Sequence, residues 1–300
     1  MKPKKAGQYL EYVTFKIFMR LAMSLPEGPA LLAGSFLGWI VGNVLRVRRT
    51  EVEKNLLLAF PESTGPWRHG IARASYMHLG REAVATIRLS QGTRRDLIER
   101  TQILGFESFQ SAIKEGRGVV LVTGHLGNWE IGGGAFAARG ISLDAVAKEM
   151  ANKRFGEAIS RVRKDLGIGL IQMDEVTREV PRSLLKSRVV AIPADQHAHR
   201  GGLSALFFGS EVSTTRVPAV FSVRIGAPMF LGIALRDKGK KQCYTLSLEK
   251  IDFEPSGKVN ADIRELTAAH SAALERAVRV APEQYFWQHR RWRSSPKPNG

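Results

Sequence analysis

Short apolar runs alternate with longer segments of helical periodicity from residue 108 to residue 280. The apolar runs are rich in aliphatic side chains and predict strands at 119–123, 143–147, 169–173, 189–193, 228–235 and 244–251, with a hairpin turn at 236–242 before the last. The intervening segments predict helices at 108–115, 129–139, 153–166, 175–187, 215–225 and 260–280. Such alternation is typical of an α/β fold, so we expect a mostly parallel central sheet flanked by helices.

The beginning of the chain has a different pattern. Residues 9–21 place apolar side chains at helical spacing with charges on the other faces, which predicts an amphipathic helix. Residues 28–45 then run for eighteen positions without a charge, and three arginines follow within the next four positions. Because a bilayer span takes about 20 apolar residues, this run either lies in the membrane interface, crosses the bilayer, or packs as a helix on the rest of the protein. Its basic flank favours a cytoplasmic catalytic domain, and the lack of an Ala-x-Ala-like site after it argues against a removable signal peptide.

The rest of the chain is expected to form one domain. Residues 50–60 and 67–90 predict further helices separated by a proline-bounded break. Neither an internal repeat nor an interdomain linker is visible. We therefore expect N-terminal helical membrane-associating segments over residues 1–49, a catalytic domain over 50–293, and a disordered tail at 294–300.

The charge balance is strongly basic. Lysine and arginine number 45 against 28 aspartate and glutamate, which gives a formal net charge of +17. Such a charge indicates polyanionic partners: nucleic acid, an anionic membrane face or an acidic protein. The basic clusters are scattered among apolar segments and no nucleic-acid module is legible, so we expect an anionic membrane surface as partner and no nucleic acid.

Metal and thiol chemistry find little support. Cys243 is the sole cysteine, which excludes an intramolecular disulfide and argues against a Cys-based metal site. His197 and His199 lie one residue apart, but no companion set of Cys or Glu side chains accompanies them, so we predict no metal site.

The strongest candidate chemistry lies at 124–130, Gly-His-Leu-Gly-Asn-Trp-Glu, directly after the predicted strand 119–123. His125 is expected at the carboxyl end of that strand, the sheet edge where ligand sites collect in open α/β folds. If Glu130 lies in the first turn of the next helix, its carboxylate can reach back to one imidazole nitrogen while the other faces a substrate. Such a pair is a general base. The alternative is a purely structural hydrogen-bonded pair.

Two further polar residues are candidates. Asn128 is either a donor to a developing oxyanion or the N-cap of the following helix. Asp195 follows the predicted strand 189–193, so it also belongs to the expected active edge. It either braces His125, binds a substrate, or caps a turn or helix.

The heptapeptide resembles the His-x4-Asp/Glu motif of the lysophospholipid acyltransferase-like superfamily. Its residue sequence is similar to that of the bacterial lipid A late acyltransferases, the lauroyl/myristoyl acyltransferase family. Other segments resemble this family in the same order: 55–62, 115–120, Asp195-Gln196, Phe207-Phe208-Gly209 with Thr215, and 282–292. The segment 161–167 is similar to the family's Arg-x3-Gly segment. In two places the chain departs from the family: at 146–150, where relatives carry a Tyr-Arg-Pro-like segment, and at His197 and His199.

The resemblance implies an acyltransferase of the inner membrane, with its catalytic domain on the cytoplasmic side. It implies transfer of a fatty acyl chain from an acyl carrier protein thioester to a hydroxyl of a lipid A precursor, a phosphorylated glycolipid, without a cofactor. His125 would take the hydroxyl proton and Glu130 would hold the imidazole. Arg163 either clamps a phosphate or is an exposed helix arginine. Because the chain lacks a Gly-x-Ser-x-Gly elbow, a covalent acyl-enzyme is not required.

Two alternatives remain open. Mycobacterial phosphatidylinositol mannoside acyltransferases share much of this framework, so the reaction can instead be acyl-CoA-dependent acylation of a phosphatidylinositol mannoside or another phospholipid. From another class, the chain can be a noncatalytic basic protein peripheral to the membrane.

Overall fold

The computed structural model describes residues 16–17, 20–89, 92–148, 153–199, 201–237 and 244–293. At its centre is a seven-stranded sheet with the order β1-β9-β8-β2-β5-β3-β4. Every neighbouring pair is parallel except β8 and β9, which are antiparallel. The strands are β1 (Thr101–Leu104), β2 (Val119–Thr123), β3 (Leu143–Ala147), β4 (Gly169–Gln172), β5 (Val189–Pro193), β8 (Met229–Arg236) and β9 (Tyr244–Lys250). The predicted α/β fold with a mostly parallel sheet is therefore confirmed.

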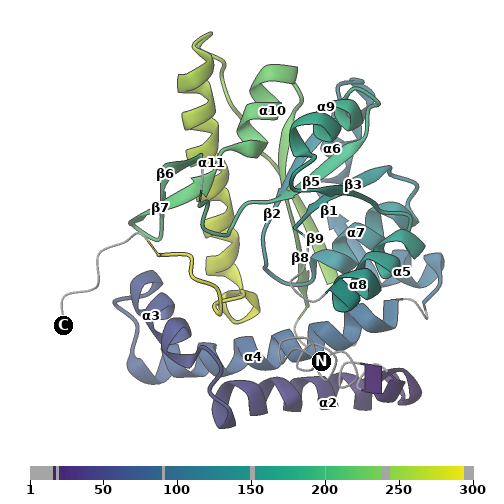
Figure 1. Ribbon diagram of the computed structural model, residues 1–300, viewed down its shortest axis with the longest axis vertical. Helices are drawn as coiled ribbons and strands as arrows, with labels where there is room; N and C mark the ends of the chain where they lie inside the picture. The colour runs from purple at the N-terminus through teal and green to yellow at the C-terminus, as the bar shows by residue number, and fades with distance from the viewer. Residues whose placement is uncertain are drawn as a thin grey trace, which may run out of the picture.

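Helices cover both faces of this sheet, as Figure 1 shows for α10 and α11 on one side and α7 on the other. Strand β2 explains why. Val119 and Leu121 point to the core under one set of helices, whereas Val120 and Val122 point to the core under the other. The helices after β1 are α6 (Phe106–Lys114), α7 (Trp129–Ala138), α8 (Lys153–Asp165), α9 (Val176–Leu184), α10 (Val217–Ile225) and α11 (Val259–Val280). All six were predicted from periodicity.

Three strands were not predicted. Strand β1 is short, and β6 (Gly202–Phe207) and β7 (Ser210–Thr215) form a separate antiparallel hairpin. Phe208 and Gly209 make its turn, both with positive φ, and Phe208 is 5% exposed. The Phe-Phe-Gly motif is thus a hairpin turn whose aromatic rings belong to the core.

The N-terminal helices form a layer of their own at one end of the molecule. They are α2 (Glu27–Trp39), its π-helical continuation (Ile40–Val44), α3 (Arg49–Ala59) and α4 (Gly65–Arg88), whereas α5 (Arg94–Arg100) packs beside α7. Helix α2 lies along α4 (Figure 1), with glycines at the crossing. A Cβ at Gly38 or Gly80 would come under 3.0 Å from the backbone of the other helix, so only glycine permits this close approach.

The run 28–45 therefore packs on the protein along one face. Its other face exposes large apolar side chains: Leu32, Phe36, Leu37, Val41, Val44 and Leu45. Among the described residues no single helix combines the length and hydropathy of a membrane span; α2 with its continuation and α3 reach them together, but with a bend of 91° between them. The tail at 294–300, Cys243, and most of the amphipathic helix and of the hairpin turn lie outside the described residues.

The C-terminal segment closes the fold. After the 3-10 turn Pro282–Gln284, the chain continues through a series of turns between the helical layer and the sheet, where Trp287 and Trp292 are at most 1% exposed. Asn55, fully buried on α3, donates its side-chain amide to the carbonyls of Trp287 and His289, at 2.8 Å each. Helix α3 and the C-terminal segment are thereby fixed to each other.

Candidate active site

The candidate site lies at the carboxyl ends of β2 and β5, which are neighbours in the sheet. The loop after β2 turns sharply at Gly127, whose φ is +65° and whose Cβ, if present, would clash with the carbonyl oxygen of Ala234. Two backbone hydrogen bonds tie the loop to the C-terminal segment: Gly127 N–H donates to Gln284 O at 3.0 Å, and Phe286 N–H donates to His125 O at 2.9 Å. The loop that carries His125 is therefore held rigidly.

His125 is paired with Asp195, the second residue after β5. Its Nδ1 lies 2.8 Å from Asp195 Oδ1, and its backbone N–H donates to Oδ2 at 2.9 Å. The carboxylate can only accept, so Nδ1 carries the proton and Nε2 is left with a lone pair. Asp195 is 0% exposed, whereas the His125 side chain is 24% exposed. This is the orientation of a general base that presents one nitrogen to a cavity. Gln196 Nε2, at 3.4 Å, is the side-chain group beside that nitrogen.

The environment tunes both groups. Burial lowers the pKa of His125, but the charge and hydrogen bond of Asp195, with a contribution from Glu130, outweigh it and leave the pKa raised. Burial would raise the pKa of Asp195, but His125 and His289 hold it well below its ordinary value. Asp195 is thus an anion that stabilises an imidazolium at His125.

Two C-terminal residues complete the support of Asp195. His289 Nε2 lies 3.5 Å from Asp195 Oδ2, and the Tyr285 hydroxyl lies 3.0 Å from the same nitrogen. Burial and the Asp195 charge raise the pKa of Tyr285 well above its ordinary value, so the phenol stays protonated. Both residues belong to the signature at 282–292, but nothing in its local pattern places them on Asp195. Sequence reasoning missed this contact.

Glu130 has a different partner from the one expected. Among the described residues, the carboxylate hydrogen-bonded to His125 is Asp195, and Glu130 instead accepts from Arg163 Nε at 2.9 Å and from Trp129 Nε1 at 3.0 Å. Glu130 does begin α7, as predicted, but its side chain turns toward α8. Arg163 is correspondingly not an exposed helix arginine, since its side chain is 14% exposed. The ion pair stands at the mouth of the cavity and contributes to the pKa of His125 only through its charges.

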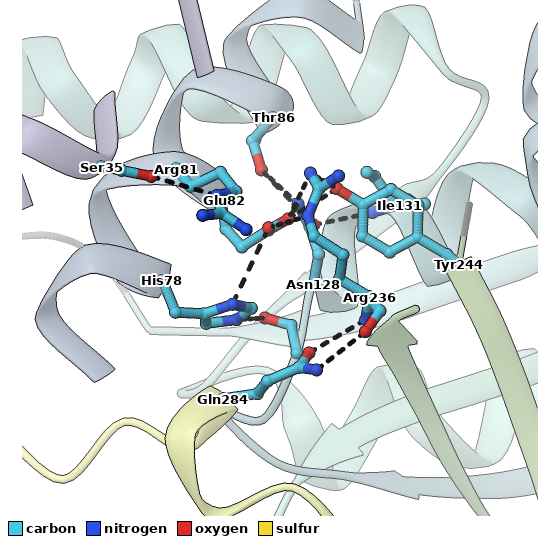
Figure 2. A network of polar contacts seen from close by, with 11 residues as sticks. Ser35, His78, Arg81, Glu82, Thr86, Asn128, Ile131, Arg236, Tyr244 and Gln284 are labelled. Atoms are coloured by element: carbon cyan, nitrogen blue, oxygen red, sulfur yellow. Dashed lines mark hydrogen bonds and ion pairs between the residues drawn. The ribbon is translucent and has the colours of Figure 1, made fainter. Parts of the chain in front are cut away.

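Asn128 is the N-cap of α7. Its Oδ1 accepts from Ile131 N–H at 3.0 Å, and its Nδ2 donates to Glu82 Oε2 at 2.8 Å (Figure 2). Its exposed fraction is 2%. Because both ends of the amide are occupied away from the cavity, the expectation of an oxyanion donor is corrected here in favour of the cap.

A cavity of about 530 Å³ opens at His125. Its deep part lies between α7 and the sheet and exists because small residues line it, among them Gly132, Gly133, Ala145, Gly232 and Ala234. Its mouth is polar. The polar mouth residues are Lys148, Arg163, Gln196, His197, His199 and Thr215. The cavity therefore joins an apolar slot to a polar entrance, and His125 lines it as well.

His197 and His199 meet edge to face with their ring centroids 5.0 Å apart. Within the described ranges, His, Cys, Asp and Glu side chains nowhere converge in groups of three or more that could hold a metal ion. Burial and the positive charges of His199, Arg291 and Arg293 lower the pKa of His197. The pair belongs to the mouth of the cavity.

Comparison with known proteins finds acyltransferases over most of the chain. The model of the family described as "Bacterial lipid A biosynthesis acyltransferase" matches residues 1–294. The chain is 26% identical over 281 residues to a lipid A biosynthesis palmitoleoyltransferase of Escherichia coli K12, covering 92% of this chain and 89% of that one. It is 25% identical, with the same coverage, to the lipid A biosynthesis lauroyltransferase of that organism. A phosphatidylinositol mannoside acyltransferase of Mycolicibacterium smegmatis is 25% identical over 52% of each chain.

Proposed function

The chain belongs to the bacterial lipid A biosynthesis acyltransferase family, and from that premise we propose that it moves a fatty acyl chain from an acyl carrier protein thioester to a hydroxyl of a lipid A precursor, with His125 as general base. The observation that carries this proposal is the His125–Asp195 pair, at 2.8 Å, placed where a polar mouth meets an apolar slot. An acyl thioester and a glycolipid hydroxyl are the two reactants that such a boundary suits.

The chemistry follows from the lone pair on His125 Nε2. As the acceptor oxygen attacks the thioester carbonyl carbon, Nε2 takes the hydroxyl proton, and Asp195 stabilises the imidazolium that forms. The tetrahedral intermediate then collapses, the carbon–sulfur bond breaks, and the imidazolium returns the proton to the leaving thiolate. The products are an ester and a thiol, and the enzyme is unchanged. General base catalysis of this kind contributes about 10²- to 10⁴-fold.

Glu130 and Arg163 are assigned to substrate positioning. Their contact holds the guanidinium at the mouth of the cavity, where a phosphate of the glycolipid or of the donor would arrive. Glu130 also keeps the net charge of the mouth from rising further, and it raises the pKa of His125. We thus infer an electrostatic and positioning role for Glu130 and reserve the direct support of the imidazole for Asp195.

The apolar slot is proposed to hold the acyl chain, and this predicts a change of chain length. Leucine at Gly133 would fill the slot, because even a Cβ there lies 3.0 Å from Ile168 Cδ1 and 3.4 Å from Leu143 Cδ2. One excess methylene in a tight apolar pocket costs about 1–3 kcal/mol. Gly133→Leu should therefore lower kcat/KM for the longest accepted chain by about tenfold or more relative to a chain a few methylenes shorter.

The measurement is competition between thioesters of graded length, read by mass spectrometry of the product. Gly134→Ala is the control, since Gly134 does not line the cavity and its Cβ would meet Leu97 at an ordinary 3.4 Å. An unchanged order of preference in Gly133→Leu would place the acyl chain elsewhere.

The surroundings are proposed to be the cytoplasmic face of the bacterial inner membrane. The exposed apolar face of α2 and the charge of +17 support binding to an anionic bilayer. An acidic carrier protein and a phosphorylated acceptor are also suited to that charge. The cavity could then receive one substrate from the water and the other from the bilayer.

A direct assay tests the proposal. Purified enzyme is supplied with acyl carrier protein and acyl-CoA thioesters in parallel, each with a lipid A precursor or a phosphatidylinositol mannoside. We expect ester formation from the carrier protein thioester on the lipid A precursor. Product from acyl-CoA on the mannoside would favour the alternative that the mycobacterial relative supports, and consumption of neither thioester would favour a noncatalytic peripheral protein.

A further inference from the structure

A buried carboxylate on α4, Glu82, stands at the junction of the helical layer, the sheet and the catalytic loop (Figure 2). It is 6% exposed. Arg236 Nε, from the end of β8, donates to its Oε1 at 2.6 Å, and the Tyr244 hydroxyl, from β9, donates to its Oε2 at 2.6 Å. Asn128 Nδ2 is the third donor, at 2.8 Å. One side chain therefore gathers three elements that are far apart in the sequence.

The polar contacts continue from this cluster into the backbone of the catalytic loop. Asn128 N–H donates to Ala234 O at 2.8 Å, and His78 Nε2 lies 3.3 Å from Gly127 O. Gln284 accepts from Arg236 N–H at 2.9 Å and donates back to Arg236 O at 2.8 Å, while its own carbonyl holds Gly127 N–H. The cluster thus fixes Gly127 and Asn128, two of the three residues between His125 and the first turn of α7.

Stability alone is a poor explanation for such an arrangement. Removing a carboxylate and a guanidinium from water carries a large desolvation cost, and well-packed apolar replacements of buried ion pairs are often as stable or more so. Both partners here are nearly enclosed, with side-chain exposures of 9% for Arg236 and 7% for Glu82. What apolar side chains would not supply is the short, charged acceptor that Glu82 offers to Asn128 Nδ2, whose other acceptor, Thr86 Oγ1, lies at a longer 3.3 Å. Glu82 is therefore the stronger of the two groups that set the direction of the cap of α7.

We propose that Glu82 is a positioning residue for acyl transfer: through Asn128 it fixes the start of α7, and so the placement of the Glu130–Arg163 pair relative to His125. The expected effect on the rate of acyl transfer rests on the proposed function. The claim that Glu82 fixes the start of α7 does not depend on it. A displacement of about 1 Å between catalytic groups can cost about 10²-fold in rate.

Three variants separate positioning from stability. The triple variant Glu82→Met, Arg236→Met, Tyr244→Phe removes the charges and the phenol together and leaves Asn128 Nδ2 with only its longer contact, to Thr86 Oγ1 at 3.3 Å. The double variant Glu82→Gln, Arg236→Gln removes the charges but keeps a carbonyl oxygen for Asn128. The control is Asp144→Met with Arg188→Met, a partly buried ion pair near the amino end of β3, where Arg188 Nε donates to Asp144 Oδ2 at 2.6 Å.

Kinetics and hydrogen exchange are measured on each, with urea unfolding to verify the fold. We expect the triple variant to lose about thirtyfold in kcat with KM nearly unchanged, and its amides at 127–131 to exchange about tenfold faster. The amide double variant should recover kcat to within about threefold of the parent, and the control should change neither quantity. If the triple variant does not fold, the amide double variant is compared with Asn128→Ala, which should show the kcat loss and the faster exchange while the double variant shows neither.

Unchanged exchange at 127–131 in a folded triple variant, or in Asn128→Ala, would overturn the proposal whatever the activity. Faster exchange with full kcat would overturn the kinetic role. If the parent itself transfers no acyl group, the proposed function fails, and the exchange data still decide whether Glu82 fixes the loop.

Discussion

Replacing His125 with asparagine is expected to reduce acyl transfer by about 10²- to 10⁴-fold, because it removes the atom that takes the acceptor proton. Asparagine is the sharper choice over alanine, since its Nδ2–H can still donate to Asp195 in place of the imidazole Nδ1–H. The buried carboxylate then keeps a partner, and we expect the free energy of unfolding to change by less than about 1 kcal/mol. The loss should fall on kcat and not on KM.

The measurement is the initial rate of ester formation at saturating thioester and acceptor, together with urea unfolding of the same preparation. His69→Asn serves as the matched control, because it removes an exposed imidazole on α4 that does not line the cavity. Its rate should equal that of the parent. Parent-like rates in His125→Asn would reject the general base, and with it the proton transfer on which the mechanism depends.

The positions of the two candidate catalytic groups were predictable from local pattern, but their pairing was not. His125 and Asp195 each follow a buried apolar run, and parallel strands end at the same sheet edge, so both belong to the site on sequence grounds alone. Which carboxylate meets the imidazole depends on β5 being the neighbour of β2. That adjacency joins segments 70 residues apart and leaves no trace in local periodicity.

Sequence spacing favoured Glu130 as the partner of the imidazole, and the structure explains why Glu130 does not fill that role. A carboxylate in the first turn of a helix can reach back to the preceding loop only if no nearer cation binds it. Arg163, on the helix after β3, supplies two nitrogens to Glu130 and draws the carboxylate away from the ring. The buried partners of Asp195 could not be predicted for another reason: Tyr285 and His289 lie in an irregular segment of turns, whose course is fixed by Asn55 and by aromatic packing.

In the helical layer, too, contacts between distant segments could not be predicted from the local sequence. The uncharged run 28–45 was recognisable, and its glycines were visible, but their role as a crossing with α4 depends on Gly80 in another helix. Glu82 was the more subtle case, since a single carboxylate on a long helix is ordinarily solvated. Two small residues on the same face of α4, Ser75 seven positions before it and Ala85 three positions after it, are buried as well, and they indicate that this position is enclosed.

Asp195→Asn is expected to lower kcat/KM by at least about 10²-fold, the second of the two largest effects. The amide has no charge with which to stabilise the imidazolium, and its Nδ2–H can hold the wrong tautomer of His125. Glu130→Gln should cost far less, about tenfold or below, because the imidazole keeps its hydrogen bond and only the positioning of Arg163 suffers. The ratio between the two variants tests which carboxylate supports His125, and a larger loss in Glu130→Gln would return that role to Glu130.

The pH dependence of kcat/KM also tests which carboxylate supports His125, through the direction in which the acid limb shifts. The base must be neutral to accept a proton, so kcat/KM rises with pH through the pKa of His125 in the free enzyme. That pKa is raised: burial lowers it, but Asp195 outweighs burial and Glu130 adds a smaller increase. Asp195→Asn removes the larger contribution, so the rising limb should move to lower pH while the plateau falls. Glu130→Gln should move the limb in the same direction by less, with the plateau mostly kept. Rates of both variants and the parent across the acid limb, at constant ionic strength, measure the shifts; a limb that stays in place in Asp195→Asn would mean that the titrating group is not His125.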